Sequence, residues 1–219
     1  MTSWTLTTVQ ITDRDPKATD VKALHDRVIV AALAGEPIRP VLWATPRPRV
    51  LIVRHDRPIQ REDWTPGWAV SVSHAPYWLP SGGDTIDAAV VMDAGTSGQS
   101  HAQWRRQVAE CVAKGGQGRA EKKPHRVRSP ETMAEVLAAR LAGILGPVTV
   151  EVARSWHLVG HRVREGRVQH SNHTLLRVSG TVLDAPALHA LMAEGVGRNK
   201  SFGCGLILAR PSVAVESAC

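Results

Sequence analysis

A histidine and a glycine-rich loop are the two features of this chain that could act on a phosphate. Lys22 and His25 are three residues apart, so they share one side of a helix if this segment is helical. A histidine titrates near neutrality and can give or take a proton, while a lysine can stabilise developing negative charge. We therefore predict His25 and Lys22 as catalytic residues. The alternative is that His25 is a surface histidine without a function.

The glycine-rich loop runs from Gly195 to Leu206 and contains four glycines, two cations and a serine. Glycine lets a backbone approach a ligand closely, and exposed N–H groups beside cations can bind phosphate. A P-loop would need glycine in place of Glu194 and Asn199, and a dinucleotide fingerprint would need glycine in place of Lys200. Neither motif is present, so the loop is a different phosphate-binding segment or a tight surface turn. The predicted binding residues are Gly195, Gly197, Arg198, Lys200, Ser201, Gly203 and Gly205.

The charge of the chain indicates a polyanionic partner. The net charge is +7 and the isoelectric point is about 9.9, which favours nucleic acid. A basic segment between Lys114 and Arg128 contains only one acid, Glu121, and is either an RNA-contacting segment or a solvated run of charge. Arginines also surround a predicted turn at Glu165-Gly166. The RNA-binding candidates outside the glycine loop are Lys122, Lys123, Arg126, Arg128, Arg162 and Arg164.

Several other classes of protein are disfavoured. The three cysteines are widely spaced and form no CxxC motif, which is typical of a reducing cytoplasm. No apolar run is long enough to span a membrane, and no secretory signal pattern opens the chain. The pairs His157/His161 and His170/His173 lack cysteine or carboxylate partners at ligand spacing. We expect these histidines on the surface of a basic hairpin, and we predict neither a metal nor a cofactor.

The elements that would position these residues follow a mixed pattern of strands and helices. In the first half, a strand over 4–11 precedes a helix from Asp20 to about Ala34, and further strands follow over 41–44, 49–55 and 68–73. No second helix is obvious before residue 80. Ser81-Gly82-Gly83-Asp84 is the predicted linker between two domains, 1–84 and 85–219.

The second half has a more regular pattern. It reads as a strand over 86–92, a helix opened by Ser129-Pro130, a strand over 148–153, a basic hairpin over 156–169, a strand over 174–183, a helix after Asp184 and a last strand ending at Arg210. Apart from the hairpin and an insertion, this order is β-α-β-β-α-β, the ferredoxin-like motif that RNA-recognition modules also use. One Phe and one Tyr leave little for base stacking, so we expect binding through cations and backbone. The predicted fold class is α+β.

The residues from Asp184 to Leu188, together with the glycine loop, resemble the C-terminus of a known family. The loop Gly195-Val196-Gly197-Arg198-Asn199-Lys200-Ser201-Phe202-Gly203-Cys204-Gly205-Leu206 meets the pattern G-hydrophobic-G-x-x-K-[SA]-hydrophobic-G-x-G-L. This pattern is typical of CRISPR-associated repeat-RNA endoribonucleases of the CasE (Cse3) type, subunits of the type I-E Cascade complex. Leu24-His25 also matches the place of the family's catalytic histidine, although Lys22 stands where the family often has tyrosine.

The resemblance implies two ferredoxin-like domains in tandem and cleavage of the repeat hairpin in precursor CRISPR RNA without a metal. It implies products with a 5′-OH and a 2′,3′-cyclic phosphate, a guide RNA that stays bound, and other Cascade subunits as partners. The competing hypothesis is a non-catalytic RNA-binding subunit on the same scaffold. The two hypotheses differ in whether His25 faces the RNA.

Overall fold

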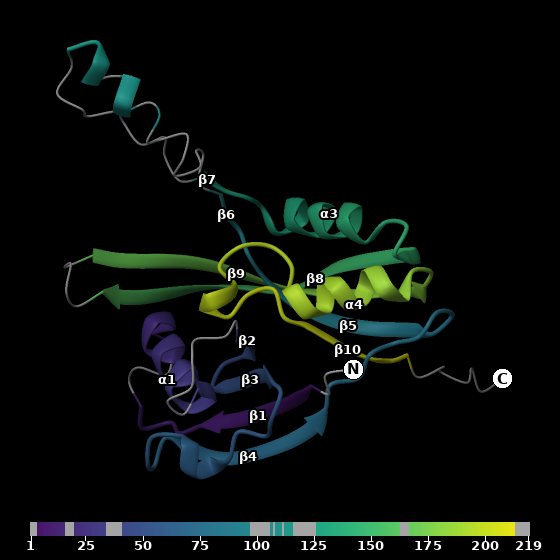
Figure 1. The fold of residues 1–219 in the computed structure, drawn as a ribbon, viewed down its shortest axis with the longest axis horizontal. Coiled ribbons are helices and arrows are strands. Elements are labelled where there is room, and N and C mark those ends of the chain that lie inside the picture. The colour runs from purple at the N-terminus through teal and green to yellow at the C-terminus, as the bar shows by residue number, and fades with distance from the viewer. Residues whose placement is uncertain are drawn as a thin grey trace.

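Two four-stranded sheets form the framework of the protein (Figure 1). The computed structural model describes residues 4–15, 20–33, 41–96, 106, 108–110, 112–115, 126–162 and 167–212. No helix among these residues is long and apolar enough to cross a membrane. The elements of the first half are β1 (Thr5–Ile11), α1 (Val21–Leu33), β2 (Leu42–Arg47), β3 (Val50–His55), the 3₁₀ helix η1 (Arg61–Asp63) and β4 (Ala69–Pro76).

The first sheet has the strand order β2-β3-β1-β4, and all neighbouring strands are antiparallel. This is the order of a ferredoxin-like sheet, in which helix α1 connects β1 to β2 and covers one face. The second connection contains only η1 where the motif has a helix. Pro58 and Pro66 bracket this connection, and too few residues lie between them for a helix of ordinary length.

The second sheet has the order β10-β5-β9-β8 and is also antiparallel throughout, so the first half's topology is repeated. Helices α3 and α4 lie on the same side of this sheet (Figure 1). Both sheets therefore confirm the predicted α+β fold with tandem ferredoxin-like motifs. The elements are β5 (Thr85–Asp93), β6 (Gly95–Thr96), β7 (Arg126–Val127), α3 (Pro130–Leu141), β8 (Leu145–Arg162), β9 (Arg167–Val182), α4 (Ala185–Glu194), the 3₁₀ helix η2 (Lys200–Phe202) and β10 (Ile207–Pro211).

Strands β8 and β9 form one long hairpin, which corrects the sequence analysis. We predicted two short strands and a separate hairpin over 156–169, but the pairing is continuous from Leu145 opposite Val182 to Arg162 opposite Arg167. The register shifts between Gly146 and Thr149 and again between Val152 and Arg154. Each shift interrupts the alternation of side chains, so the sequence pattern looked like shorter strands. The predicted turn at Glu165-Gly166 lies outside the described residues.

The two sheets are held together by apolar side chains. One cluster lies between the first sheet and α1, and another surrounds the second sheet and includes Leu42, Ala44 and Tyr77 from the first half. Trp156 on β8 packs against both clusters. Asp20, at the start of α1, also forms a backbone bridge with Val159 on β8, so the long hairpin passes beside this helix. The division into domains 1–84 and 85–219 stays a prediction.

Candidate functional site

Helix α1 positions the predicted catalytic histidine. The side chain of Asp20 caps the helix, because its Oδ1 accepts the backbone N–H groups of Lys22 and Ala23, both at 2.9 Å. Leu24 and Val28 are buried, as the predicted apolar stripe requires. His25 lies at the edge of this stripe and is half-buried. The helix therefore holds the imidazole at the boundary between the core and the surface.

The glycine loop packs closely against the protein itself. Gly195, Gly203 and Gly205 are buried and have positive φ angles of 74°, 82° and 85°. A Cβ at Gly203 would lie 2.7 Å from the ring of Trp43, and a Cβ at Gly205 would lie 2.3 Å from the Val196 carbonyl oxygen. These positions need glycine because of both the backbone conformation and the lack of space. A role of these three glycines in binding phosphate stays a prediction.

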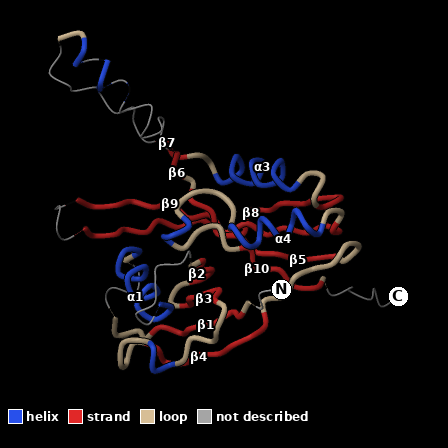
Figure 2. The backbone as a smooth tube through the Cα atoms, in the orientation of Figure 1, coloured by secondary structure: helices blue, strands red, loops and turns tan. Residues whose placement is uncertain are grey.

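The loop passes around the edge of the first sheet at β2. It starts beside Leu42, since a Cβ at Gly195 would lie 2.9 Å from Leu42 Cδ1, it reaches Trp43 at Gly203, and it returns to Val196 at Gly205. Successive side chains of a strand point to opposite faces, so the loop crosses from one face of the sheet to the other. Trp43 Nε1 also donates a hydrogen bond to the carbonyl oxygen of Ser201 at 3.2 Å. The tan loop after α4 in Figure 2 follows this path toward α1.

This path brings Ser201 and Phe202 next to His25. The rings of His25 and Phe202 are tilted by 50°, with centroids 5.4 Å apart. His25 Nδ1 is buried and has no hydrogen-bond partner among the described residues. Burial lowers the pKa of His25, while the backbone of Ser201 and the carboxylate of Asp26 act in the opposite direction. Because its pKa is below the ordinary value of 6.5, His25 is mainly neutral at pH 7 and is suited to accept a proton.

Lys22 lies one turn before His25 and forms an ion pair with Asp26. The side chain of Lys22 is 32% exposed and that of Asp26 is 57% exposed, so the pair is open to solvent. The positive charge of Lys22 contributes to the lowered pKa of His25. Asp26 was not among the predicted site residues, although the i,i+4 spacing from Lys22 is a standard signal for a helical ion pair.

The other predicted binding residues are spread over the surface. Arg198 and Ser201 in the loop are exposed, Lys200 and Gly197 are partly exposed, and a Cβ at Gly197 would lie 3.3 Å from Met92 Cε. Arg128 is exposed, just before α3. The backbones of Arg126 and Arg162 belong to β7 and β8, but their side chains are not described, and Lys122, Lys123 and Arg164 lie outside the described residues. Thus the structure brings Ser201 to His25 and Lys22, while the role of each residue in RNA binding stays a prediction.

Three functional candidates were not named from the sequence: Trp43, Phe202 and Arg54. Phe202 is the only phenylalanine of the chain and directly follows Ser201, which was the available signal. Trp43 and Arg54 sit in strands whose alternating pattern indicates burial but gives no partner. Trp43 is buried beneath the glycine loop, and Arg54 is buried between the first sheet and α4.

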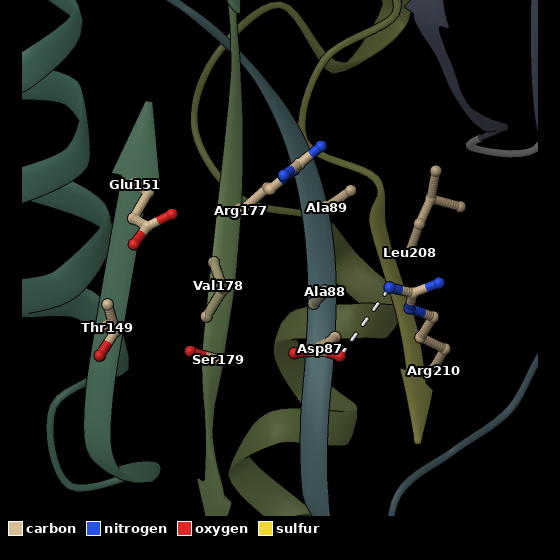
Figure 3. Close-up of a pocket in the computed structure, with 10 residues that line it drawn as sticks. All are labelled: Asp87, Ala88, Ala89, Thr149, Glu151, Arg177, Val178, Ser179, Leu208 and Arg210. Atoms are coloured by element: carbon tan, nitrogen blue, oxygen red, sulfur yellow. Dashed lines mark ion pairs between the residues drawn. The ribbon is translucent and has the colours of Figure 1, made fainter. Parts of the chain in front are cut away.

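A hollow of about 500 Å³ lies elsewhere, on the face of the second sheet that points away from α4 (Figure 3). Two carboxylates and two guanidinium groups line it, and Arg210 Nη2 lies 3.9 Å from Asp87 Oδ2. Carboxylates repel phosphate, and none of the predicted site residues lies in this hollow. Among the described residues, no three His, Cys, Asp or Glu side chains gather closely enough to hold a metal ion. The His25 region is therefore the candidate site.

Comparisons with known proteins agree on one family and one fold. The family model described as "CRISPR associated protein" matches residues 5–211. Among solved structures, CRISPR endoribonuclease Cse3 bound to a 19-nucleotide RNA is similar, with a TM-score of 0.68, 16% identity, and coverage of 95% of this chain and 98% of that chain. No curated protein sequence matches this chain.

Two further structures have the same fold. Thermus thermophilus Cse3, bound to an RNA that represents a pre-cleavage complex, has a TM-score of 0.67 at 16% identity, with 95% of this chain and 100% of that chain covered. Cas6e from Escherichia coli K-12 has a TM-score of 0.58 at 16% identity, again with 95% and 100% covered.

Proposed function

Because this chain belongs to the family of CRISPR-associated proteins, we propose that it is an endoribonuclease that cleaves the repeat hairpins of precursor CRISPR RNA without a metal. One observation carries the proposal: a half-buried histidine with a lowered pKa lies against a conspicuous glycine loop. The same fold in an RNA-bound endoribonuclease supports the substrate class. A chain of this fold also occurs in a CRISPR RNA-guided surveillance complex, which supports other subunits of such a complex as partners.

The proposed reaction uses the nucleophile that RNA carries. The neutral imidazole of His25 accepts the proton of the 2′-OH, and the 2′-oxygen attacks the adjacent phosphorus. The bond between phosphorus and the 5′-oxygen breaks, and that oxygen takes a proton from an acid or from water. The products are a 2′,3′-cyclic phosphate and a 5′-OH, so no metal-bound nucleophile is needed.

The neighbours of His25 have different proposed roles. Since His25 Nδ1 is buried, Nε2 is the nitrogen that meets the RNA. Lys22 lowers the pKa of His25 and stabilises the charge that develops on the phosphate. Arg198, Lys200 and the exposed Ser201 bind the phosphates beside the cleaved bond, and basic residues of the second half hold the hairpin. We also place the protein in the cytoplasm, where the free thiol of Cys204 is stable.

The test is cleavage of a hairpin repeat RNA in the presence of EDTA. The wild type should cleave the RNA, and a 2′-deoxy substitution at the cleavage site should stop the reaction because the nucleophile is absent. His25→Ala should slow single-turnover cleavage by about 10²–10⁴-fold and keep the affinity, because a general base is lost while the binding cations remain. Lys22→Ala should give a smaller loss of rate.

The outcomes separate catalysis from binding alone. Cleavage of the deoxy substrate would defeat the mechanism, and a wild-type rate for His25→Ala would move the catalytic residue elsewhere. Tight binding with no cleavage by the wild-type protein would instead identify a non-catalytic RNA-binding subunit. Val30→Ala is a matched control on the same helix, because Val30 is uncharged and 70% exposed, and it should leave the cleavage rate unchanged.

A further inference from the structure

Arg54 is a buried arginine in the first sheet. It lies on β3 and is only 3% exposed. Its guanidinium carbon is 4.3 Å from the centroid of the Trp4 ring and 5.6 Å from that of the Tyr77 ring. Burial of a charged group is strongly unfavourable unless good partners replace water. The partners of this guanidinium therefore indicate what it does.

Those partners are carbonyl groups at the end of helix α4. Arg54 Nη1 donates to the carbonyl oxygen of Met192, and Nη2 donates to that of Ala193 at 2.7 Å. The last carbonyls of a helix have no partner within the helix, and its C-terminus favours positive charge. The planar guanidinium can reach two of these carbonyls at once. Arg54 thus fastens the end of α4 to the first sheet.

The glycine loop starts directly after this contact. Gly195 follows α4, and its N–H donates to the carbonyl oxygen of Leu191 at 2.8 Å. At the other end of the loop, Tyr77 Oη donates to the carbonyl oxygen of Ile207 at 2.6 Å. Arg54 and Tyr77 therefore hold the two ends of the loop, and Trp43 supports its middle. All three side chains come from the first half of the chain, as does His25.

We propose that Arg54 is a positioning residue: by holding the end of α4, it sets where the glycine loop places Ser201 and Phe202 against His25. The effect of Arg54 on cleavage rests on the function proposed above, whereas its effect on the surroundings of His25 is independent of that function. The guanidinium acts through α4 and the loop and has no direct contact with the reacting atoms.

The first measurement separates the rate of cleavage from RNA binding. Arg54→Lys keeps the charge but cannot span two carbonyls. It should slow single-turnover cleavage by about tenfold or more, because small displacements in an active site are costly, and it should raise the Kd for RNA by a smaller factor, because most of the proposed binding cations lie outside the loop. The control is Arg57→Lys, since Arg57 lies just after β3 and forms a partly exposed ion pair with Asp63 at 3.2 Å. Wild-type cleavage by Arg54→Lys would overturn the proposal.

The second measurement needs neither RNA nor activity. In NMR spectra of the free protein, Arg54→Lys should shift the ring signals of His25, because Phe202 moves relative to that ring. The ring signals of His157, which is exposed on the face of β8 opposite to that of the buried Leu158, should stay in place. Unchanged His25 signals would overturn the proposal even if the protein cleaves no RNA. If Arg54→Lys does not fold, Trp4→Leu decides, since it removes the ring beside the guanidinium and should produce the same shift.

Discussion

At the scale of single residues, burial lowers the pKa of two histidines that lie in different surroundings. His25 is half-buried at the edge of α1, next to Phe202 of the glycine loop. His173 on β9 has no exposed surface, and its ring meets that of Trp156 edge-on with centroids 5.7 Å apart. His173 was predicted to lie on the surface, and this prediction was wrong, because its side chain lies beside Trp156 on the face of the hairpin that packs against the core. Burial, and to a lesser extent His157, lowers the pKa of His173 to about 4.

The pKa of His173 predicts a loss of stability in acid. Between pH 6.5 and pH 4 the unfolded chain binds a proton at His173 and the folded protein does not, so the free energy of unfolding falls as the pH falls. The loss should approach roughly 3 kcal/mol near pH 4. The free energy of unfolding, measured with urea at pH 7 and at pH 4.5, should differ less between the two pH values for His173→Leu than for the wild type. The control His74→Gln should retain the wild-type difference, because His74 is exposed on β4 in the other sheet, and an equal difference in all three proteins would contradict the prediction.

At the scale of elements, the glycine loop is held by contacts at its start, in its middle and at its end. Helix α4 ends against Arg54, the loop turns around β2, and the 3₁₀ helix η2 ends at Gly203 against Trp43. In the same segment, Asn199 Nδ2 donates to Asp93 Oδ2 at 2.5 Å, which ties the loop to β5. The conformation of the loop is therefore determined by contacts on both sheets.

Gly203→Val should lower stability and slow cleavage together. The new side chain would collide with the Trp43 ring and would require a left-handed backbone, which we expect to reduce the free energy of unfolding by about 1–3 kcal/mol. Gly67→Val is the matched control, because Gly67 has a similar φ of 74° and nothing within 4 Å of its Cβ position. Thermal unfolding and single-turnover cleavage should show a larger effect for Gly203→Val. Equal effects would mean that the contact with Trp43 is unimportant.

At the scale of the whole molecule, the net charge of +7 should make RNA binding strongly dependent on salt. Each phosphate contact on single-stranded RNA contributes about −0.7 to the slope of log K against log salt concentration. About five contacts from the glycine loop, the basic segment and the hairpin would give a slope of roughly −3 to −4. Filter binding of a hairpin repeat RNA between low and moderate salt measures the slope. An affinity that does not change with salt would contradict the electrostatic interpretation of the charge.

Local patterns in the sequence were sufficient to predict the regular elements and their order. Asp20, Ser129 and Asp184 begin the three described helices with hydrogen bonds to backbone N–H groups within the next three residues, so each start signal is local. The strand and helix pattern predicted the ferredoxin-like motif of the second half for the same reason, whereas the motif of the first half was implied only by the resemblance to a known family. The long hairpin was misread where its two register shifts break the local alternation.

Only the tertiary structure placed the elements of the site against one another. Trp43 and Ser201 are 158 residues apart, and Arg54 and Met192 are 138 residues apart. The periodicity of a helix or strand indicates which face is buried, but it does not identify the partner of that face. The sequence by itself therefore determined the histidine on its helix and the glycines in their loop. The packing of the two sheets decided that the loop meets the histidine and that Arg54 and Trp43 hold it there.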